Sequence, residues 1–153
     1  MSTYQVTWKD ITKFKNWITF FIKDIDVIVG ILRGGSTLAV IASHMLDKEV
    51  YWLEAKSYKG RKAEKLTIYN HSVGYNICNK RVLLIDDVVD KGTTILRAKE
   101  LLEGFAPVCI VPVVLIIKEK SLSLCDNLNL KHLLTTSKDW IDFPWENNKR
   151  RKI

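Results

Sequence analysis

Cysteine, proline and long apolar runs are scarce in this sequence. The three cysteines, Cys78, Cys109 and Cys125, are odd in number and lack the spacing of metal ligands, so they indicate a reducing compartment rather than a disulfide framework. The longest apolar run, Val108–Ile117, is interrupted by Pro112 and is shorter than the roughly 20 residues that a membrane-spanning helix needs. The first residues do not resemble a secretory signal. We therefore expect a cytoplasmic protein without a membrane partner.

Internal repeats, low-complexity segments and linkers are also missing from the 153 residues. The content of 47% apolar and 27% charged residues is typical of a globular chain. We expect one domain over residues 1–146 and a flexible basic tail over residues 147–153. The net charge of +7 falls to +3 without Lys149, Arg150, Arg151 and Lys152. No basic stripe with interleaved aromatics occurs outside this tail, so nucleic acid is not the expected partner.

Apolar periodicity predicts strands that alternate with helices. We expect helices from an Asp10 cap to about Lys23, over Thr37–Leu46, and over Thr93–Leu102 with a stop at Gly104. The expected strands are Val27–Leu32, Val50–Tyr58, Leu66–Ser72, Arg81–Ile85, Val108–Ile117 and His132–Thr136, with a mobile loop over Lys59–Lys65. Most of these strands show no polar alternation, which is typical of a parallel sheet covered on both faces. Such sheets bind ligands at the carboxyl ends of their strands.

The segment Val82–Thr94 carries the strongest chemical signal. Four apolar residues precede Asp86 and Asp87, and Gly92-Thr93-Thr94 then opens a helix whose free amides suit a phosphate. Adjacent carboxylates beside a phosphate-binding turn predict a site for a phosphorylated sugar and a divalent cation. The alternative is a surface acidic loop that only caps a helix. Neither a P-loop nor a dinucleotide-binding glycine motif is present, which argues against those nucleotide-binding classes.

These thirteen residues resemble the 5-phosphoribosyl 1-pyrophosphate (PRPP) signature of type I phosphoribosyltransferases. Other segments look like the bacterial xanthine-guanine enzymes in the same order: Val6-Thr7-Trp8, Arg33-Gly34-Gly35, Ser57-Tyr58, Asp139-Trp140-Ile141 and Pro144-Trp145-Glu146. The resemblance implies an α/β, single-domain type I phosphoribosyltransferase fold, with a central, mainly parallel sheet flanked by helices. It also implies a small C-terminal hood over about residues 131–146.

The resemblance further implies which residues bind PRPP. Asp87 would hold Mg²⁺, and Asp86 with Asp87 would engage the ribose hydroxyls. The backbone from Asp90 to Thr94 would bind the 5′-phosphate, and the turn at Arg33 would bind pyrophosphate, unless that turn is a plain β-turn with a solvated arginine. The complete set implied for PRPP is Arg33, Gly34, Lys65, Asp86, Asp87, Val88, Val89, Asp90, Lys91, Gly92, Thr93 and Thr94.

The base would be bound by later residues. By the same resemblance, Lys118 donates to a 6-oxo group, Trp140 stacks on the purine, the carbonyl of Ile141 accepts from a 2-substituent, and Asp90 takes the ring proton as the catalytic base. Taken alone, Trp140 would be read as a buried core residue and Lys118 as a lysine whose stem lies along a strand end. The implied reaction converts PRPP and a 6-oxopurine into pyrophosphate and a purine nucleotide.

Two positions depart from the family pattern. Lys91 stands where a threonine is common, and Glu64 aligns with the mobile-loop arginine, which Lys65, Lys62 or Arg61 would have to replace.

Guanine is the leading base, with xanthine and hypoxanthine open. We expect a homo-oligomer, either dimer or tetramer. The alternatives are a PRPP-sensing regulator that binds nucleic acid, and a phosphoribosyltransferase for another base.

Overall fold

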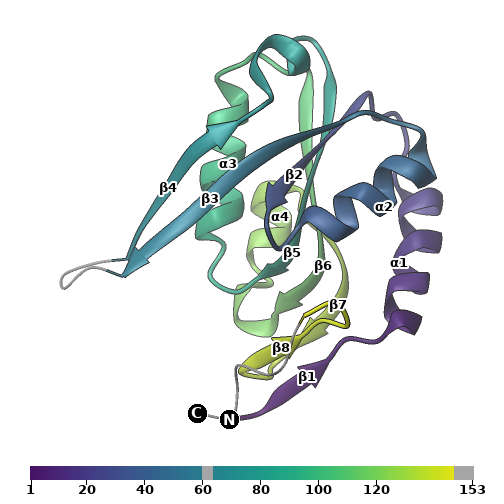
Figure 1. Ribbon diagram of the computed structural model, residues 1–153, viewed down its shortest axis with the longest axis vertical. Helices are drawn as coiled ribbons and strands as arrows, with labels where there is room; N and C mark the ends of the chain where they lie inside the picture. Colours follow the sequence, from purple (N-terminus) through teal and green to yellow (C-terminus); the bar gives the residue numbers. More distant parts are fainter. Residues whose placement is uncertain (60–63, 147–153) are drawn as a thin grey trace.

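The computed structural model describes residues 1–59 and 64–146, in which strands and helices alternate (Figure 1). The strands are β1 (Thr3–Gln5), β2 (Val27–Leu32), β3 (Val50–Lys59), β4 (Glu64–His71), β5 (Arg81–Val89), β6 (Cys109–Lys118), β7 (Lys131–Thr136) and β8 (Trp140–Asp142). The helices are α1 (Trp8–Phe21), α2 (Ser36–Leu46), α3 (Thr93–Glu103) and α4 (Leu124–Leu128), with single 3-10 turns η1 (Gly74–Ile77) and η2 (Glu119–Ser121). None of the helices in these two ranges is long and apolar enough to span a membrane.

A six-stranded sheet in the order β4-β3-β2-β5-β6-β7 forms the centre of the molecule. Every neighbouring pair is parallel except β3 and β4, which form an antiparallel hairpin. The predicted α/β fold with a mainly parallel sheet is therefore confirmed. Because parallel strands share a direction, the carboxyl ends of β2, β5 and β6 meet at one edge, where ligands bind in such sheets.

Both faces of this sheet are covered, because successive side chains of a strand point to opposite sides. Ile28 and Leu83 pack with the apolar side chains of α1 and α2, whereas Val29 and Leu84 pack with those of α3. The helices lie accordingly on either side of the strands in Figure 1. A continuous apolar run such as Val82–Ile85 is thus buried on both faces, as the sequence predicted.

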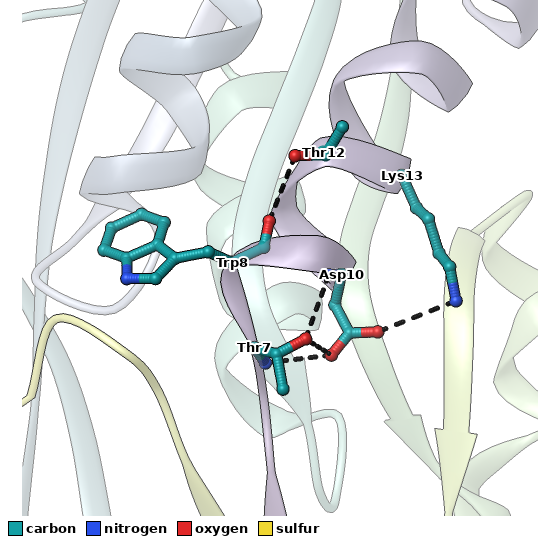
Figure 2. A network of polar contacts seen from close by, with 5 residues as sticks. All are labelled: Thr7, Trp8, Asp10, Thr12 and Lys13. Atoms are coloured by element: carbon teal, nitrogen blue, oxygen red, sulfur yellow. Dashed lines mark hydrogen bonds and ion pairs between the residues drawn. The ribbon is translucent and has the colours of Figure 1, made fainter.

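Helix α1 begins with a capping box (Figure 2). The hydroxyl of Thr7 accepts from the amide of Asp10 at 3.3 Å, and the Asp10 carboxylate accepts from the amide of Thr7 at 2.9 Å. The expectation that Asp10 itself is the cap was wrong. Thr7 is the N-cap and Asp10 is the third helical residue, because two reciprocal bonds satisfy more orphan amides than one carboxylate in the cap position would.

Strand β5 extends four residues beyond the predicted end at Ile85. Val88 and Val89 pair with Ile116 and Ile117 of β6, so the ladder continues past the two carboxylates. The β-branched valines favour the extended conformation, and their pairing with β6 stabilises the strand although two charged residues precede them. Asp86 and Asp87 therefore lie within the last half of the strand and not in a loop after it.

The two ends of the described chain meet in a second, small sheet. Strand β8 pairs in parallel with β1, and β7 is the edge strand of the main sheet. The segment expected to form the hood, residues 131–146, is thus divided between the two sheets. Only the part after β7 leaves the main sheet.

Candidate functional site

The turn after β2 lies directly against the Asp87 carboxylate. A Cβ atom added at Gly34 would lie 2.4 Å from Oδ2 of Asp87, and one added at Gly35 would lie 2.6 Å from the carbonyl oxygen of Ile85. The peptide bond between Leu32 and Arg33 is cis. The structure thus brings the Arg33-Gly34 turn and the acidic pair together, as neighbouring parallel strands require. Glycine is needed here because any side chain would occupy the space of the carboxylate.

The acidic pair is largely removed from solvent, and Asp86 is only 7% exposed. Its Oδ1 accepts from the amide of Asp87 at 2.9 Å, and Oδ1 of Asp87 accepts from the amide of Val88 at 2.7 Å. Burial, followed by the adjacent negative charge of Asp87, raises the pKa of Asp86 well above its usual value. Burial also raises the pKa of Asp87. Such a pair favours a bound cation, because a cation would stabilise both charges.

The two carboxylates fit the needs of Mg²⁺. This ion is commonly bound through one or two carboxylates together with substrate phosphates and water, rather than by a cage of protein ligands. No group of three or more histidine, cysteine, aspartate or glutamate residues forms a metal cluster in the part of the chain that the structure describes. The site therefore suits an ion whose coordination shell is completed by oxygen atoms of a phosphorylated substrate.

The loop from Asp90 to Gly92 leads from β5 into α3. Gly92 has φ +86°, where L side chains are strained, and it is the N-cap of the helix. Because Gly92 offers no capping side chain, the first-turn amides can donate to an anion. Thr93 is exposed and Thr94 half-buried at this helix start, whereas the side chain of Val89 is buried in the α3-side core. Val89 can therefore contribute only backbone atoms, whereas the side chain of Val88 is half-buried against the core beside α1 and α2.

A polar pocket of about 360 Å³ adjoins this loop. Its lining consists of Asp90, Lys118, Glu119, Lys120, Thr136, Ser137, Lys138 and Asp139. Lys118, at the end of β6, is 7% exposed and donates to the backbone carbonyls of Lys138 and Asp139, the latter at 3.0 Å. An ammonium group has three donors, so one N–H remains for a ligand. Asp90 and Lys118, which the resemblance assigned to the base, thus line the same pocket.

The other two residues assigned to the base lie elsewhere. Trp140 is 48% exposed, is not part of the pocket lining, and donates from Nε1 to Oδ1 of Asp142 at 3.2 Å. The side chain of Ile141 is buried in the core beside α1 and α2. Trp140 and Asp142 make the ladder bonds to β1, and alternate residues of a strand face opposite sides, so the Ile141 carbonyl points away from β1. The Ile141 carbonyl therefore takes no part in the ladder between β1 and β8.

Several neighbours of the site had no sequence signal. The amide and hydroxyl of Ser2 donate to Oδ2 of Asp139 at 2.8 and 3.0 Å, and these bonds lower the pKa of Asp139. Lys120 and Ser121 contact Asp90, as described below. No sequence pattern links residues so far apart along the chain. Lys65 and the loop residues Arg61 and Lys62 remain untested, because the side chain of Lys65 and both loop residues lie outside what the structure describes.

A second cavity, of about 400 Å³, lies at the opposite edge of the sheet. It is lined by Thr19, Ile22, Lys23, Asp24, Ile25, Met45, Leu46, Lys48 and Arg81. The guanidinium of Arg81 is held by both carboxylate oxygens of Asp26, at 3.0 and 2.9 Å. Because this arginine is already paired within the fold and no phosphate-binding turn is near, the smaller pocket beside Asp90 is the better candidate site.

Comparison with known proteins agrees with this geometry. The family model of the phosphoribosyl transferase domain matches residues 9–147, so the chain belongs to that family. A purine phosphoribosyltransferase from Pyrococcus horikoshii is 31% identical, with a TM-score of 0.84 and coverage of 96% of both chains. The Helicobacter pylori xanthine-guanine-hypoxanthine phosphoribosyltransferase, at 23% identity and a TM-score of 0.75 over 94% of both chains, shares the fold. The type I phosphoribosyltransferase fold is thereby confirmed.

The curated relatives that the chain matches are named transcriptional regulators. The transcriptional regulator GfcR of Methanosphaera stadtmanae is 32% identical over 115 residues, which make up 74% of this chain and 56% of the regulator. GfcR of Methanocaldococcus jannaschii is 29% identical, and the match covers 76% of this chain and 59% of the regulator. The chain thus spans about half the length of the curated relatives it matches.

Proposed function

We propose that this chain transfers the 5-phosphoribosyl group of PRPP to a 6-oxopurine in an Mg²⁺-dependent reaction of purine salvage. The products are a nucleoside 5′-monophosphate and pyrophosphate. The observation that carries the proposal is the succession of three groups along one sheet edge: the Asp86–Asp87 pair, the helix start at Gly92 and the pocket between Asp90 and Lys118. The likeness to a purine phosphoribosyltransferase over 96% of both chains supports a purine as the acceptor.

The PRPP half of the site has to bind a 5′-phosphate, a pyrophosphate and a ribose. The amides from Asp90 to Thr94 bind the 5′-phosphate at the start of α3, where the helix dipole favours an anion. Asp86 and Asp87 accept hydrogen bonds from the ribose hydroxyls. Arg33 and the Gly34 backbone bind the pyrophosphate and stabilise its charge as it leaves. Mg²⁺ held by Asp87 would supply further neutralisation of this leaving group.

The base half of the site orients a purine and removes one proton. Lys118 donates to the 6-oxo oxygen, and the Ile141 carbonyl accepts from a 2-amino group. The carboxylate of Asp90 accepts the ring proton while the base nitrogen bonds to the anomeric carbon. General base catalysis of this kind accelerates reactions by roughly 10²–10⁴-fold. Trp140 stacks on the bound purine, and its half-exposed ring on β8 is open to such a contact.

A regulator that senses PRPP and binds nucleic acid is the second candidate, because the curated relatives are named transcriptional regulators. The basic residues Lys149–Lys152 would be its nucleic-acid contact within this chain, and they lie outside the described residues. A complete pair of base-recognising groups, Asp90 and Lys118, argues for the enzyme, because a sensor of PRPP alone needs no base pocket.

The direct test is nucleotide formation by the purified chain with Mg²⁺, PRPP and each base in turn. We expect kcat/KM for guanine to exceed that for hypoxanthine by roughly 3- to 30-fold, since hypoxanthine leaves the Ile141 carbonyl without its donor. Adenine should not react, because its 6-amino group meets Lys118 donor to donor. Adenine turnover equal to that of guanine would contradict the role of Lys118, and a preference for hypoxanthine would contradict that of Ile141.

Two further arms complete this test. Asp87→Asn should lower kcat/KM by about 100-fold or more without unfolding the chain, because it removes one charge of the proposed Mg²⁺ site. The matched control Asp47→Asn changes an acid at the end of α2 and should leave activity unchanged.

A mobility-shift measurement on duplex DNA, with and without PRPP, tests whether the chain is a regulator that binds DNA. PRPP-dependent DNA binding by a chain that forms no nucleotide would favour the second candidate.

A further inference from the structure

The segment of residues 119–124 contacts the loop between β5 and α3 at three points. The Nζ atom of Lys120 lies 2.5 Å from Oδ1 of Asp90. The hydroxyl of Ser121 donates to the backbone carbonyl of the same aspartate. A Cβ atom at Gly92 would lie 2.3 Å from Cδ1 of Leu124, so α4 packs against the end of the loop. This segment therefore forms the outer wall of the loop that carries Asp90.

The loop of residues 90–92 depends on contacts with residues 119–124, because the backbone pairing of β5 with β6 ends before the loop begins. The ladder between β5 and β6 ends at Val89, and α3 begins at Thr93. Residues 90–92 in between belong to neither element. A side chain on such a segment keeps one direction only if groups from elsewhere hold it. Ser121 is buried and holds the backbone of Asp90, while Lys120 holds its carboxylate.

The ion pair between Lys120 and Asp90 can orient the Asp90 carboxylate but adds little to the free energy of folding. The side chains of Lys120 and Asp90 are 61% and 56% exposed, and exposed pairs contribute little to folding. A ligand can therefore displace or share the lysine at small cost. Both side chains line the pocket next to Lys118, so the carboxylate is held at the place where a base would enter.

We propose that Lys120 and Ser121 are positioning residues that fix Asp90 for proton removal from the base. The inference rests on the proposed function, in which Asp90 accepts the ring proton. In that step the proton passes to the carboxylate, the nitrogen–carbon bond forms, and the carbon–oxygen bond to pyrophosphate breaks with its electron pair on the leaving oxygen. Lys120 and Ser121 take no part in these bond changes and act only through the direction of the Asp90 carboxylate.

The test is a double-mutant cycle between positions 120 and 90. Lys120→Met should lower kcat by about 10-fold and leave KM for PRPP within about twofold, because the 5′-phosphate is bound by loop amides. In the background of Asp90→Asn the same change should cost nothing more, since the group it positions is gone. Lys120→Arg should retain most of the activity. Lys99→Met is the matched control, because it breaks a 2.6 Å pair with Glu103 on α3. Equal losses in both backgrounds would overturn the inference.

A second readout does not depend on turnover. Ser121→Ala should speed hydrogen exchange of the amides at residues 90–92 in the ligand-free protein by several-fold, whereas Lys99→Met should not. Unchanged exchange in Ser121→Ala overturns the positioning contact itself. Absence of nucleotide formation by the wild-type chain with every base would overturn the proposed function and the catalytic part of this inference, while the exchange measurement would still decide whether the contact holds the loop.

Discussion

At the scale of single residues, the site is built from close approaches that leave no spare volume. Gly34 brings its backbone against Asp87, and Gly92 brings the helix start against Leu124. Burial raises the pKa values of both Asp86 and Asp87, and the negative charge of Asp87 raises that of Asp86 further. The chemistry of these residues therefore depends on backbone contacts as much as on their own side chains.

Gly34→Ala tests the closest of these approaches. The added Cβ would lie 2.4 Å from a carboxylate oxygen of Asp87, so either the turn or the carboxylate must move. A displacement of about 1 Å at a reacting centre can cost about 100-fold in rate, and we expect a loss of that order in kcat/KM. Gly104→Ala is the matched control, because its Cβ would meet only the Leu101 carbonyl, at 3.2 Å. Equal effects of the two substitutions would contradict the role of the Gly34 turn.

At the scale of elements, local signals in the sequence predict most of the strands and helices near the site. Strand β2 has the predicted bounds Val27–Leu32, and α3 runs from Thr93 to Glu103 with Gly104 as its C-cap, one residue beyond the prediction. Helix α1 is fixed by its capping box rather than by one aspartate. The ends of elements depend on such reciprocal contacts, which is why the start of α1 and the end of β5 were misjudged.

Thr7→Ala should lower the free energy of unfolding by about 1 kcal/mol, since it removes the acceptor for the Asp10 amide and the partner of its carboxylate. Urea unfolding monitored by circular dichroism measures this change. The control is Thr12→Ala, whose hydroxyl donates to the Trp8 carbonyl on the exposed face of the same helix (Figure 2). Its cost should stay below about 0.5 kcal/mol. A larger effect at Thr12 than at Thr7 would be inconsistent with the capping box.

At the scale of the whole molecule, the fold joins the two ends of the described chain beside the pocket. Strand β1 pairs with β8, and Ser2 holds Asp139, whose carbonyl in turn holds Lys118. The first residues thus support Lys118, the lysine proposed to bind the base, which lies more than 100 positions away in sequence. The expected dimer or tetramer stays a prediction, and sedimentation velocity can measure it.

The buried acidic pair should make the stability of the whole chain depend on pH and on Mg²⁺. In the metal-free protein, the raised pKa of Asp86 favours the fold below the unfolded-state pKa of about 4, and this contribution is lost as pH rises through the folded-state pKa. Asp86→Asn should therefore raise Tm relative to wild type by an amount that grows with pH above about 4. Mg²⁺ should raise the wild-type Tm more at pH 8 than at pH 5. Scanning calorimetry with EDTA or Mg²⁺ measures both, and a pH-independent difference would contradict the burial argument.

The sequence predicted most of what is local. The apolar runs gave the strands, and the Val82–Thr94 motif gave the acidic pair and the helix start that the structure places at one edge. The family resemblance assigned Asp90 and Lys118 to the base, and the structure shows that both line one pocket. The roles assigned to Trp140, Ile141 and the metal at Asp87 remain predictions, because the structure contains neither base nor metal.

By itself, the sequence determined the order and type of the elements, because hydrophobic period, capping residues and glycine turns act between residues a few positions apart. Only the tertiary structure decided which distant groups meet: Gly34 with Asp87, Lys120 and Ser121 with Asp90, and Ser2 with Asp139. Strand order and the packing of helices on the sheet bring these residues together. No local pattern encodes such distances, since they follow from how the whole core is packed.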